Sequence, residues 1–398
     1  MGAVPERGSH RVMETERTER LLNWVRLLAE EVGPRRPGSD RELEAAERLA
    51  GRLRDCGLDA RLEPFRGYPT FGLPFGLTIA AAISPELLPR SRVFARSLLA
   101  ALAAAALATE GSLIRTPLGR ALARWPSSNV VATIEPSAEV RRTLCLMAHY
   151  DTSRSGLIFD PRLVGWLGRW IGLNTILILA GLAEPLAPRS RWVRRSLRVA
   201  RGLLAGSLGL LAEREVRGVD VAGANDNASG VAVVAELACE LLALPLASTR
   251  VVVCLTGCEE AGTLGAQAML DSRDTGEWLF LNIDNVGGGG TVRYLRREGV
   301  ITHWDADPGL IAVAEAIARA NPGLRMAAED APAGLTYDAC QVHARGGRAL
   351  TLSVQDGFIP NLHQPTDTVA NVDADGIART YAAARTIVAA IDRGAAGA

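Results

Sequence analysis

Short apolar runs that alternate with helical patterns constrain the fold of this 398-residue chain more than any other feature. Apolar runs of strand length occupy residues 129–134, 143–148, 251–255, 279–283 and 349–354. Apolar residues recur at helical spacing over residues 229–242, 309–320 and 374–392. Strands that are apolar on both faces need cover on both faces, which crossover helices supply. We therefore predict an α/β fold with a mostly parallel or mixed central sheet and helices on both faces.

The charged residues bear on partners and on export. The sequence contains 44 Lys or Arg and 44 Asp or Glu residues, so its formal net charge is zero. A chain without net charge has no overall attraction for nucleic acid, and we predict no nucleic-acid partner. The stretch Met1–Arg20 is polar and lacks the apolar core of a secretory signal, so no cleavable signal peptide is expected.

Two apolar segments, residues 68–115 and 157–212, interrupt the alternating pattern. Each segment contains two apolar stretches separated by arginines, which indicates a helical hairpin. We therefore expect two inserted apolar helical hairpins in a discontinuous α/β domain. The three parts of that domain are residues 14–67, 116–156 and 213–395.

The insertions have the composition of membrane-associated helices. Their uncharged stretches are shorter than the ~20 residues that span a bilayer. Residues 93–114 and 163–183 reach that length if charged side chains at their ends extend to the interface. Trp166, Trp170 and Trp192 suit the membrane–water interface. We predict membrane lipid as a partner of both insertions, with a buried helical cap over a functional site as the alternative.

The side of the membrane on which the α/β domain lies stays open. The arginine-rich turns, which include Arg189, Arg191 and Arg194, would be cytoplasmic by the positive-inside rule, with the domain outside. Without a predicted signal peptide, the domain would remain cytoplasmic if the helices only enter the interface. The sequence therefore predicts membrane association, integral or peripheral, without assigning a side.

Histidine and carboxylate residues follow the predicted strands, where α/β proteins place their sites. His149 and Asp151 end the run 143–148 and share one face at period two, so Asp151 can orient His149 as a ligand. Asp226 lies in a loop rich in Gly and Asn that opens a helix. A helix N-cap is the alternative role for this aspartate.

Two adjacent glutamates give the strongest single indication of a metal. Glu259 and Glu260 directly follow the buried run 251–255. Two like charges at that place are costly unless a cation neutralises them. Asp284 ends another apolar run, and His363 lies in a late loop.

This set of donors is typical of a catalytic site for divalent metal ions. A mixture of His, Asp and Glu without Cys suits zinc or a neighbouring divalent ion. One bridging carboxylate between ions about 3.5–4 Å apart would make a two-metal site. The other three histidines lack such surroundings and are interpreted as surface or structural residues: His10, His303 and His343.

In combination, these motifs resemble the M28 family of zinc metallopeptidases. The motifs are the HxD of His149, the loop of Asp226, the Glu259–Glu260 pair, the strand-end Asp284 and the late His363. The opening stretch 33–39 is also similar to that family. The resemblance covers roughly residues 20–67, 125–156 and 218–395. It implies a zinc exopeptidase fold of the phosphorylase/hydrolase-like type.

The resemblance also implies two Zn²⁺ ions, or other divalent ions. One ion would be shared by His149, Asp226 and Asp284. The other would be held by Asp226, Glu260 and His363, with Asp226 as the bridging ligand.

Catalytic roles follow from the same resemblance. Glu259 would be the general base, and Asp151 would orient His149. The peptide bond after Asp226 is often cis in the family, so a cis bond is expected between Asp226 and Asn227. Tyr337 is a candidate for assisting the oxyanion, with a packed tyrosine as the alternative.

We therefore predict a zinc-dependent exopeptidase, an aminopeptidase that hydrolyses N-terminal residues of peptides. One alternative is an M20-like carboxypeptidase or deacylase, because that class shares the HxD and Glu–Glu motifs. The other is a catalytically silent membrane scaffold on a peptidase fold. The stretch around Asp338 lacks a histidine that often follows the equivalent aspartate in the family, so the substrate pocket is not predicted.

Overall fold

Eight strands form one mixed sheet at the centre of the protein. The computed structural model describes residues 7–114 and 116–396. The strands of this sheet are β1 (Arg61–Gly67), β2 (Trp125–Ile134), β3 (Arg142–His149), β4 (Thr249–Thr256), β5 (Leu279–Ile283), β6 (Val292–Leu295), β9 (Met326–Glu329) and β10 (Arg348–Val354). Two very short strands, β7 (Arg297–Glu298) and β8 (Trp304–Asp305), pair separately.

The strand order is β1-β2-β4-β3-β5-β10-β6-β9. The central strands β4, β3, β5 and β10 are parallel to one another. β2 is antiparallel to β4, β1 is antiparallel to β2, and β6 is antiparallel to β10. The predicted mostly parallel or mixed sheet is confirmed.

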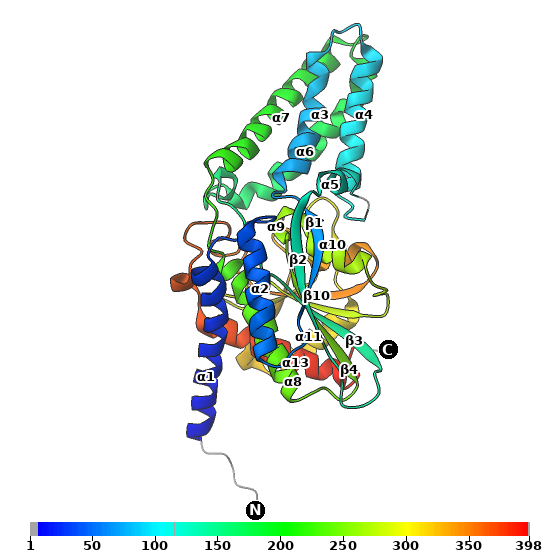
Figure 1. The fold of residues 1–398 in the computed structure, drawn as a ribbon. Helices are drawn as coiled ribbons and strands as arrows, with labels where there is room; N and C mark the ends of the chain where they lie inside the picture. Colours follow the sequence, from blue (N-terminus) through cyan, green and yellow to red (C-terminus); the bar gives the residue numbers. More distant parts are fainter. Residues whose placement is uncertain (1–6, 115, 397–398) are drawn as a thin grey trace, which may run out of the picture.

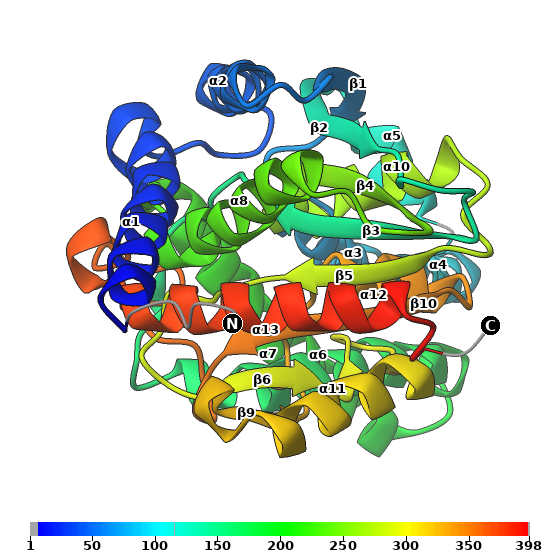
Figure 2. The same ribbon diagram turned by 90° about the horizontal axis from the view of Figure 1, so that it is seen from below.

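Helices cover both faces of the sheet (Figure 2). The helices outside the insertions are α1 (Arg7–Arg26), α2 (Asp40–Asp55), α5 (Pro117–Leu122), α8 (Gly230–Ala243), α9 (Glu259–Gly262), α10 (Leu264–Asp271), α11 (Pro308–Ala320), α12 (Ala339–Ala344) and α13 (Ala374–Asp392). Helices α1, α2, α8, α11 and α13 contribute to the larger core, together with Leu146 of β3. α10 and α12 pack on the other face against Cys145 and Met147 of the same strand. Alternate residues of β3 therefore face two cores, as a doubly covered strand requires.

The two insertions pack together as one four-helix element. Its helices are α3 (Gly72–Ile83), α4 (Val93–Glu110), α6 (Leu167–Ala180) and α7 (Arg191–Arg217). α3 packs against α4 and α7, and α6 packs against the same two helices. The element projects from one end of the α/β domain, above the carboxyl end of β3 (Figure 1). α7 extends past residue 212, so this helix is longer than the predicted insertion.

Much of the outer surface of the four-helix element is apolar. Segments Val93–Glu110 and Val164–Leu186 are long and apolar enough to cross a membrane, a test that core helices of soluble proteins also pass. Only 33% and 22% of the residues of these segments are fully buried, so both helices keep residues that are exposed or half-buried. Phe94, Ile176 and Trp192 are 82%, 66% and 65% exposed. These side chains lie on the outer surface of the four-helix element.

The sequence did not predict several short elements. β6 and β9 complete one edge of the sheet, and α10 and α12 cover one face, but each is too short to show a clear period. α1 begins at Arg7, ahead of residue 14, where the first part of the α/β domain was predicted to start. Residues 1–6, which belong to the stretch without an expected signal peptide, lie outside the described residues.

Candidate metal centre

Three neighbouring strands end at the candidate site. β3 ends at His149, which pairs in register with Thr256 at the end of β4. The turn after β4 carries Glu259 and Glu260, and Asp284 directly follows β5. Because the three strands are parallel, their carboxyl ends meet at one edge of the sheet.

Asp226 lies between two groups of donor atoms. Its Oδ1 is 3.2 Å from Nε2 of His149, and its Oδ2 is 3.2 Å from Nε2 of His363. Oδ1 of Asp284 lies 3.6 Å from Nε2 of His149, and Oε2 of Glu260 lies 3.0 Å from Nε2 of His363. Within each group the donor atoms lie within 4.8 Å of one another. The structure thus brings together the five predicted ligands as two groups that share Asp226.

The turn Ala224–Ser229 presents Asp226 to both groups. The peptide bond between Asp226 and Asn227 is cis, as the family resemblance implied. Asp367 accepts hydrogen bonds from the backbone N–H groups of Asn225 (2.6 Å) and Asp226 (3.1 Å). Asp367 therefore holds the turn in place from the loop that also carries His363.

Two further residues support the site, and the sequence analysis gave them no role. Arg35 is fully buried and donates hydrogen bonds to the carbonyl groups of Ala222 (2.6 Å) and Gly223 (3.0 Å), directly before the turn. The Nδ2 of Asn285 donates to Oδ1 of Asp284 (2.8 Å). Arg35 lies in the opening stretch 33–39 that carried part of the family resemblance, so its position was a usable signal.

Asp151 holds the turn that carries the two glutamates. Its two carboxylate oxygens accept hydrogen bonds from the backbone N–H groups of Glu259 (3.0 Å) and Glu260 (3.1 Å). Oδ1 of Asp151 lies 3.6 Å from Nδ1 of His149, which is longer than a normal hydrogen bond. Asp151 therefore orients the glutamate turn directly and faces His149 as a neighbouring charge.

The buried polar atoms of this site fit bound metal ions. Oε1 of Glu259 and Oε1 of Glu260 are buried, and neither has a hydrogen-bond partner among the described residues. Buried carboxylates without a compensating cation are costly, and five acidic side chains meet here. Histidine nitrogen and carboxylate oxygen are the donors that zinc takes in catalytic sites. The residues present therefore fit zinc.

Burial and neighbouring charges shift the pKa values of the site. Burial raises the pKa of Glu259 well above its usual value. Burial also raises the pKa of Asp284, to about 6. Burial lowers the pKa of His363, but Glu260 and Asp226 outweigh it and raise that pKa to about 9. In the metal-free protein, the site therefore holds protons on groups that a metal ion would displace.

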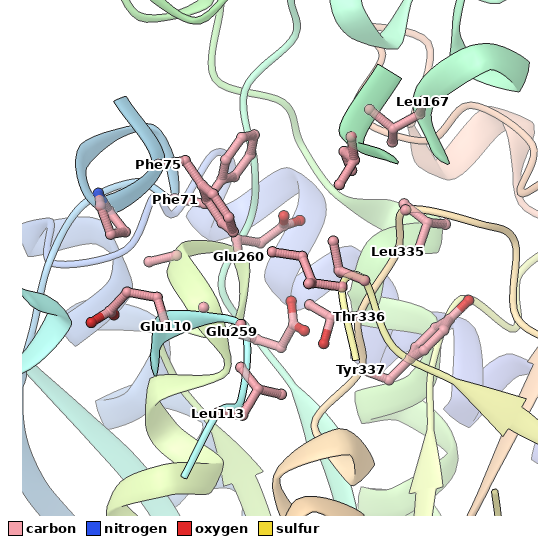
Figure 3. Close-up of a pocket in the computed structure, with 18 of the residues that line it drawn as sticks. Phe71, Phe75, Glu110, Leu113, Leu167, Glu259, Glu260, Leu335, Thr336 and Tyr337 are labelled. Carbon is pink, nitrogen blue, oxygen red and sulfur yellow. The ribbon is translucent and has the colours of Figure 1, made fainter. Parts of the chain in front are cut away.

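A cavity of about 1630 Å³, its open mouth included, extends from the site into the four-helix element. Figure 3 shows Glu259 and Glu260 at the site end, with Phe71 and Phe75 beside them and Leu335 across the cavity. This element therefore caps the site on its inner side and exposes apolar residues on its outer side.

Tyr337 also lines the cavity. Its hydroxyl group is buried and has no hydrogen-bond partner among the described residues. Burial raises the pKa of Tyr337 well above its usual value, so the phenol keeps its proton at neutral pH. It can therefore donate a hydrogen bond into the cavity.

The remaining histidines lie away from this centre where the structure describes them. His303 is exposed, and His343 is buried, with its Nε2 3.1 Å from Oε1 of Glu298. Both fit the predicted surface or structural roles. The side chain of His10 lies outside the described residues.

The fold of the chain is shared with zinc aminopeptidases of known structure. Residues 207–388, slightly less than half of the chain, match the sequence model of peptidase family M28. The family predicted from the motifs is thereby confirmed. No curated protein matches the chain by sequence.

Solved structures show the same fold at low sequence identity. A zinc aminopeptidase from Bacillus subtilis is 15% identical, with a TM-score of 0.55, and the match covers 93% of this chain and 94% of that chain. An aminopeptidase from Aneurinibacillus sp. strain AM-1 is 16% identical, with a TM-score of 0.56 and coverage of 94% and 93%. A glutaminyl cyclase from Bacteroides thetaiotaomicron is 14% identical, with a TM-score of 0.55 and coverage of 94% and 97%. The fold is therefore shared by peptidases and cyclases.

Proposed function

We propose that this chain is a zinc-dependent aminopeptidase of the M28 type that removes N-terminal residues from peptides. The observation that carries the proposal is the position of Asp226, whose two carboxylate oxygens face separate histidine–carboxylate groups. That arrangement suits two zinc ions bridged by one carboxylate. The family match and the aminopeptidases among the structural neighbours support the same function.

The chemistry assigned to the chain itself centres on Glu259. When bound, zinc ions lower the pKa of a water molecule and polarise the scissile carbonyl group. Glu259 takes the proton of that water and returns it to the leaving amine, while the water oxygen bonds to the carbonyl carbon and the C–N bond breaks. Asp151 keeps Glu259 in position through the backbone of the turn. Tyr337 is the candidate donor to the developing oxyanion.

The test is zinc content measured together with hydrolysis of aminoacyl p-nitroanilides, with and without a chelator. We expect close to two zinc ions per chain and turnover that the chelator removes. Glu259→Gln should retain the zinc and lose activity by roughly 10²–10⁴-fold, the usual contribution of general acid–base catalysis. Glu139→Gln, at an exposed glutamate, is the matched control and should leave both readouts unchanged.

Each alternative function gives a different result. Zinc with activity only on N-acyl or C-terminal substrates would indicate an M20-like carboxypeptidase or deacylase. Cyclisation of N-terminal glutamine without anilide hydrolysis would indicate a glutaminyl cyclase. Absence of both zinc and turnover would leave a membrane scaffold on a peptidase fold.

We also propose that the four-helix element associates with membrane lipid. Its support is the exposed apolar surface of α4 and α6, which is extensive for a helical cap in water. Arginines cluster at the distal turns, where they can meet lipid headgroups: Arg90, Arg92, Arg189, Arg191, Arg194 and Arg195. The catalytic cleft would then lie close to the membrane surface.

A further inference from the structure

The cavity above the candidate site is deeper than a pocket for an ordinary side chain. Along α6, its lining residues run from Leu167 to Ile178. Those residues are eleven positions apart on one helix, which corresponds to about 16 Å at about 1.5 Å per residue. Protein interiors are normally close-packed, so a void of this length inside a small helical element calls for an occupant.

The wall of the cavity is apolar along most of this length. Pro74, Ile79, Leu107 and Leu211 contribute to it from three helices. The hydroxyl group of Thr78 is already bonded to the carbonyl of Pro74 in its own helix (2.8 Å). A ligand in this part of the cavity therefore meets hydrocarbon almost everywhere.

The few polar groups of the wall disfavour a peptide as the occupant. Thr175 bonds to the carbonyl of Ile171 in its own helix (3.0 Å), which leaves Oδ1 of Asn174 as a buried acceptor without a partner among the described residues. A peptide in this space would bring about one N–H and one C=O group per residue, and each needs a partner. An alkyl chain brings none, so it fits this wall better.

Buried ion pairs occupy the four-helix element beyond the last lining residues of the cavity. Glu184 lies between Arg96 (2.6 Å) and Arg201 (2.5 Å). Arg201 also donates to the carbonyl of Ala82 (3.3 Å), which lies beyond Ile79 along α3. A cavity that is closed at its far end can hold only a group that terminates there. In aminopeptidase action, that group belongs to the short acyl side of the scissile amide, while the leaving chain continues into solvent.

We infer that the cavity within the four-helix element binds a long alkyl chain on the acyl side of the scissile amide. The substrates would be amides whose N-terminal residue carries a lipid-like chain. This inference rests on the proposed hydrolytic function for its reaction, and on the cavity for its substrate class. The reaction needs no further reactant: water supplies the new C–O bond, the C–N bond breaks, and Glu259 passes the proton to the leaving nitrogen.

The experiment is a series of p-nitroanilides of α-amino acids with linear side chains from methyl to dodecyl, below their critical micelle concentrations. We expect kcat/KM to rise by up to about fourfold per buried methylene until the cavity is filled. Thr78→Trp should fill the distal part and reduce the ratio of dodecyl to methyl activity by tenfold or more. Leu77→Trp is the matched control, because Leu77, the neighbour of Thr78, is 46% exposed and does not line the cavity.

A second pair of variants and a binding measurement distinguish loss of the alkyl-binding site from misfolding of the protein. Thr175→Trp faces the cavity, whereas Ile176→Trp on the same helix is at a 66% exposed position. Thr78→Trp and Thr175→Trp should weaken binding of a dansylated undecanoic acid to the full-length protein. Leu77→Trp and Ile176→Trp should retain that binding. Circular dichroism checks that all four variants are folded.

The outcomes separate this inference from the proposed function. Hydrolysis of the methyl substrate without any gain from longer chains would overturn the alkyl-chain inference and leave the aminopeptidase standing. A preference for oligoleucine peptides over alkyl chains of equal length would also overturn it. Probe binding that depends on Thr78 and Thr175, without turnover of any anilide, would support the alkyl site and reject the aminopeptidase. Absence of both turnover and probe binding would reject both.

Discussion

The α/β domain and the four-helix element distribute apolar and charged side chains in opposite ways. In the α/β domain, apolar residues fill two cores, and the buried carboxylates and histidines collect at the strand ends. In the four-helix element, Phe94 and Trp192 are exposed, whereas Arg96, Glu184 and Arg201 are buried together. The first arrangement is that of a protein in water with one reactive site. The second suits helices whose outer surface meets lipid, where charges face the protein interior.

Buried charges have different surroundings in the two regions. Two buried arginines of the four-helix element, Arg96 and Arg201, are paired with Glu184, and both also lie near Glu86 (3.6 Å and 2.7 Å). At the strand ends, acidic groups outnumber the two histidines, so the site is left to be neutralised from outside. The buried charges of Arg96, Glu184 and Arg201 are therefore paired within the protein, whereas those of the site are not fully neutralised.

Removal of the shared carboxylate should have the largest effect and would locate the chemistry in the α/β domain alone. Asp226→Asn weakens both ligand groups at once, so we expect loss of zinc from both positions and a fall in kcat/KM of roughly 10³-fold or more. Atomic absorption and anilide hydrolysis measure the two quantities. Asp375→Asn, at an exposed aspartate, is the control and should behave as the native protein. Normal zinc content in Asp226→Asn would contradict the bridging role.

Breaking the ion pairs of the four-helix element should have the next largest effect. Glu184→Ala leaves Arg96 and Arg201 without their main partner, which we expect to destabilise the element by about 3–5 kcal/mol. Urea unfolding and limited proteolysis within residues 68–115 would report this, while zinc content should stay constant. Replacing all three residues together, as Arg96→Met, Glu184→Leu and Arg201→Met, should restore most of the stability because no charge is left unpaired. Equal losses in both variants would show that the charges are not coupled.

The exposed apolar surface gives a third test of the comparison. Phe94→Ser, Ile176→Ser and Trp192→Ser each remove a large apolar side chain, worth about 1.5 kcal/mol or more if it is buried in lipid. We therefore expect each substitution to weaken binding to phosphatidylcholine–phosphatidylglycerol vesicles by about tenfold, as measured by flotation. Leu244→Ser changes a leucine of the α/β domain that is 68% exposed, and it should have no effect on vesicle binding. Vesicle binding that is unchanged in all four variants would make the element a cap in water.

The sequence predicted the central fold because its strands are long, apolar and followed by ligand-type residues. β3, β4 and β5 lie within one or two residues of the runs predicted for them. The ligand set was also predicted, since His149, Glu260 and Asp284 stand at strand ends and the motifs resemble one family. Short elements such as β6 and β9 were missed because four residues do not establish a period.

Features that depend on long-range contacts could not be predicted. The bond from Asp367 to the backbone of Asp226 joins residues 141 positions apart. The burial of Arg35 likewise depends on the path of the chain at Ala222 and Gly223. The cavity forms only when helices of both insertions meet, and no local pattern in either insertion indicates it. Such contacts follow from the packing of segments that the sequence shows as separate.

The smallest effect that we predict is a dependence of metal binding on pH. Glu260 and Asp226 raise the pKa of His363 to about 9 in the metal-free protein, against the effect of burial, so at neutral pH this histidine carries a proton that zinc must displace. Below pH 9, lowering the pH favours the protonated form and opposes zinc. We therefore expect the zinc affinity to fall by about tenfold per pH unit for each displaced proton. Competition with a chromophoric chelator between pH 6 and pH 8, corrected for protonation of the chelator, measures this slope.

The same change of pH should not affect the four-helix element, so the two regions should differ in their dependence on pH. The ion pairs of Glu184 with Arg96 and Arg201 involve none of the candidate zinc ligands, so these contacts do not depend on whether the metal is bound. Between pH 8 and pH 6 we expect zinc to be lost from the α/β domain while the element keeps its resistance to proteolysis. A zinc affinity that is constant over this range would mean that His363 carries no proton to displace. The carboxylates around it would then be neutralised by another route, and the charge of the site would have to be reassigned.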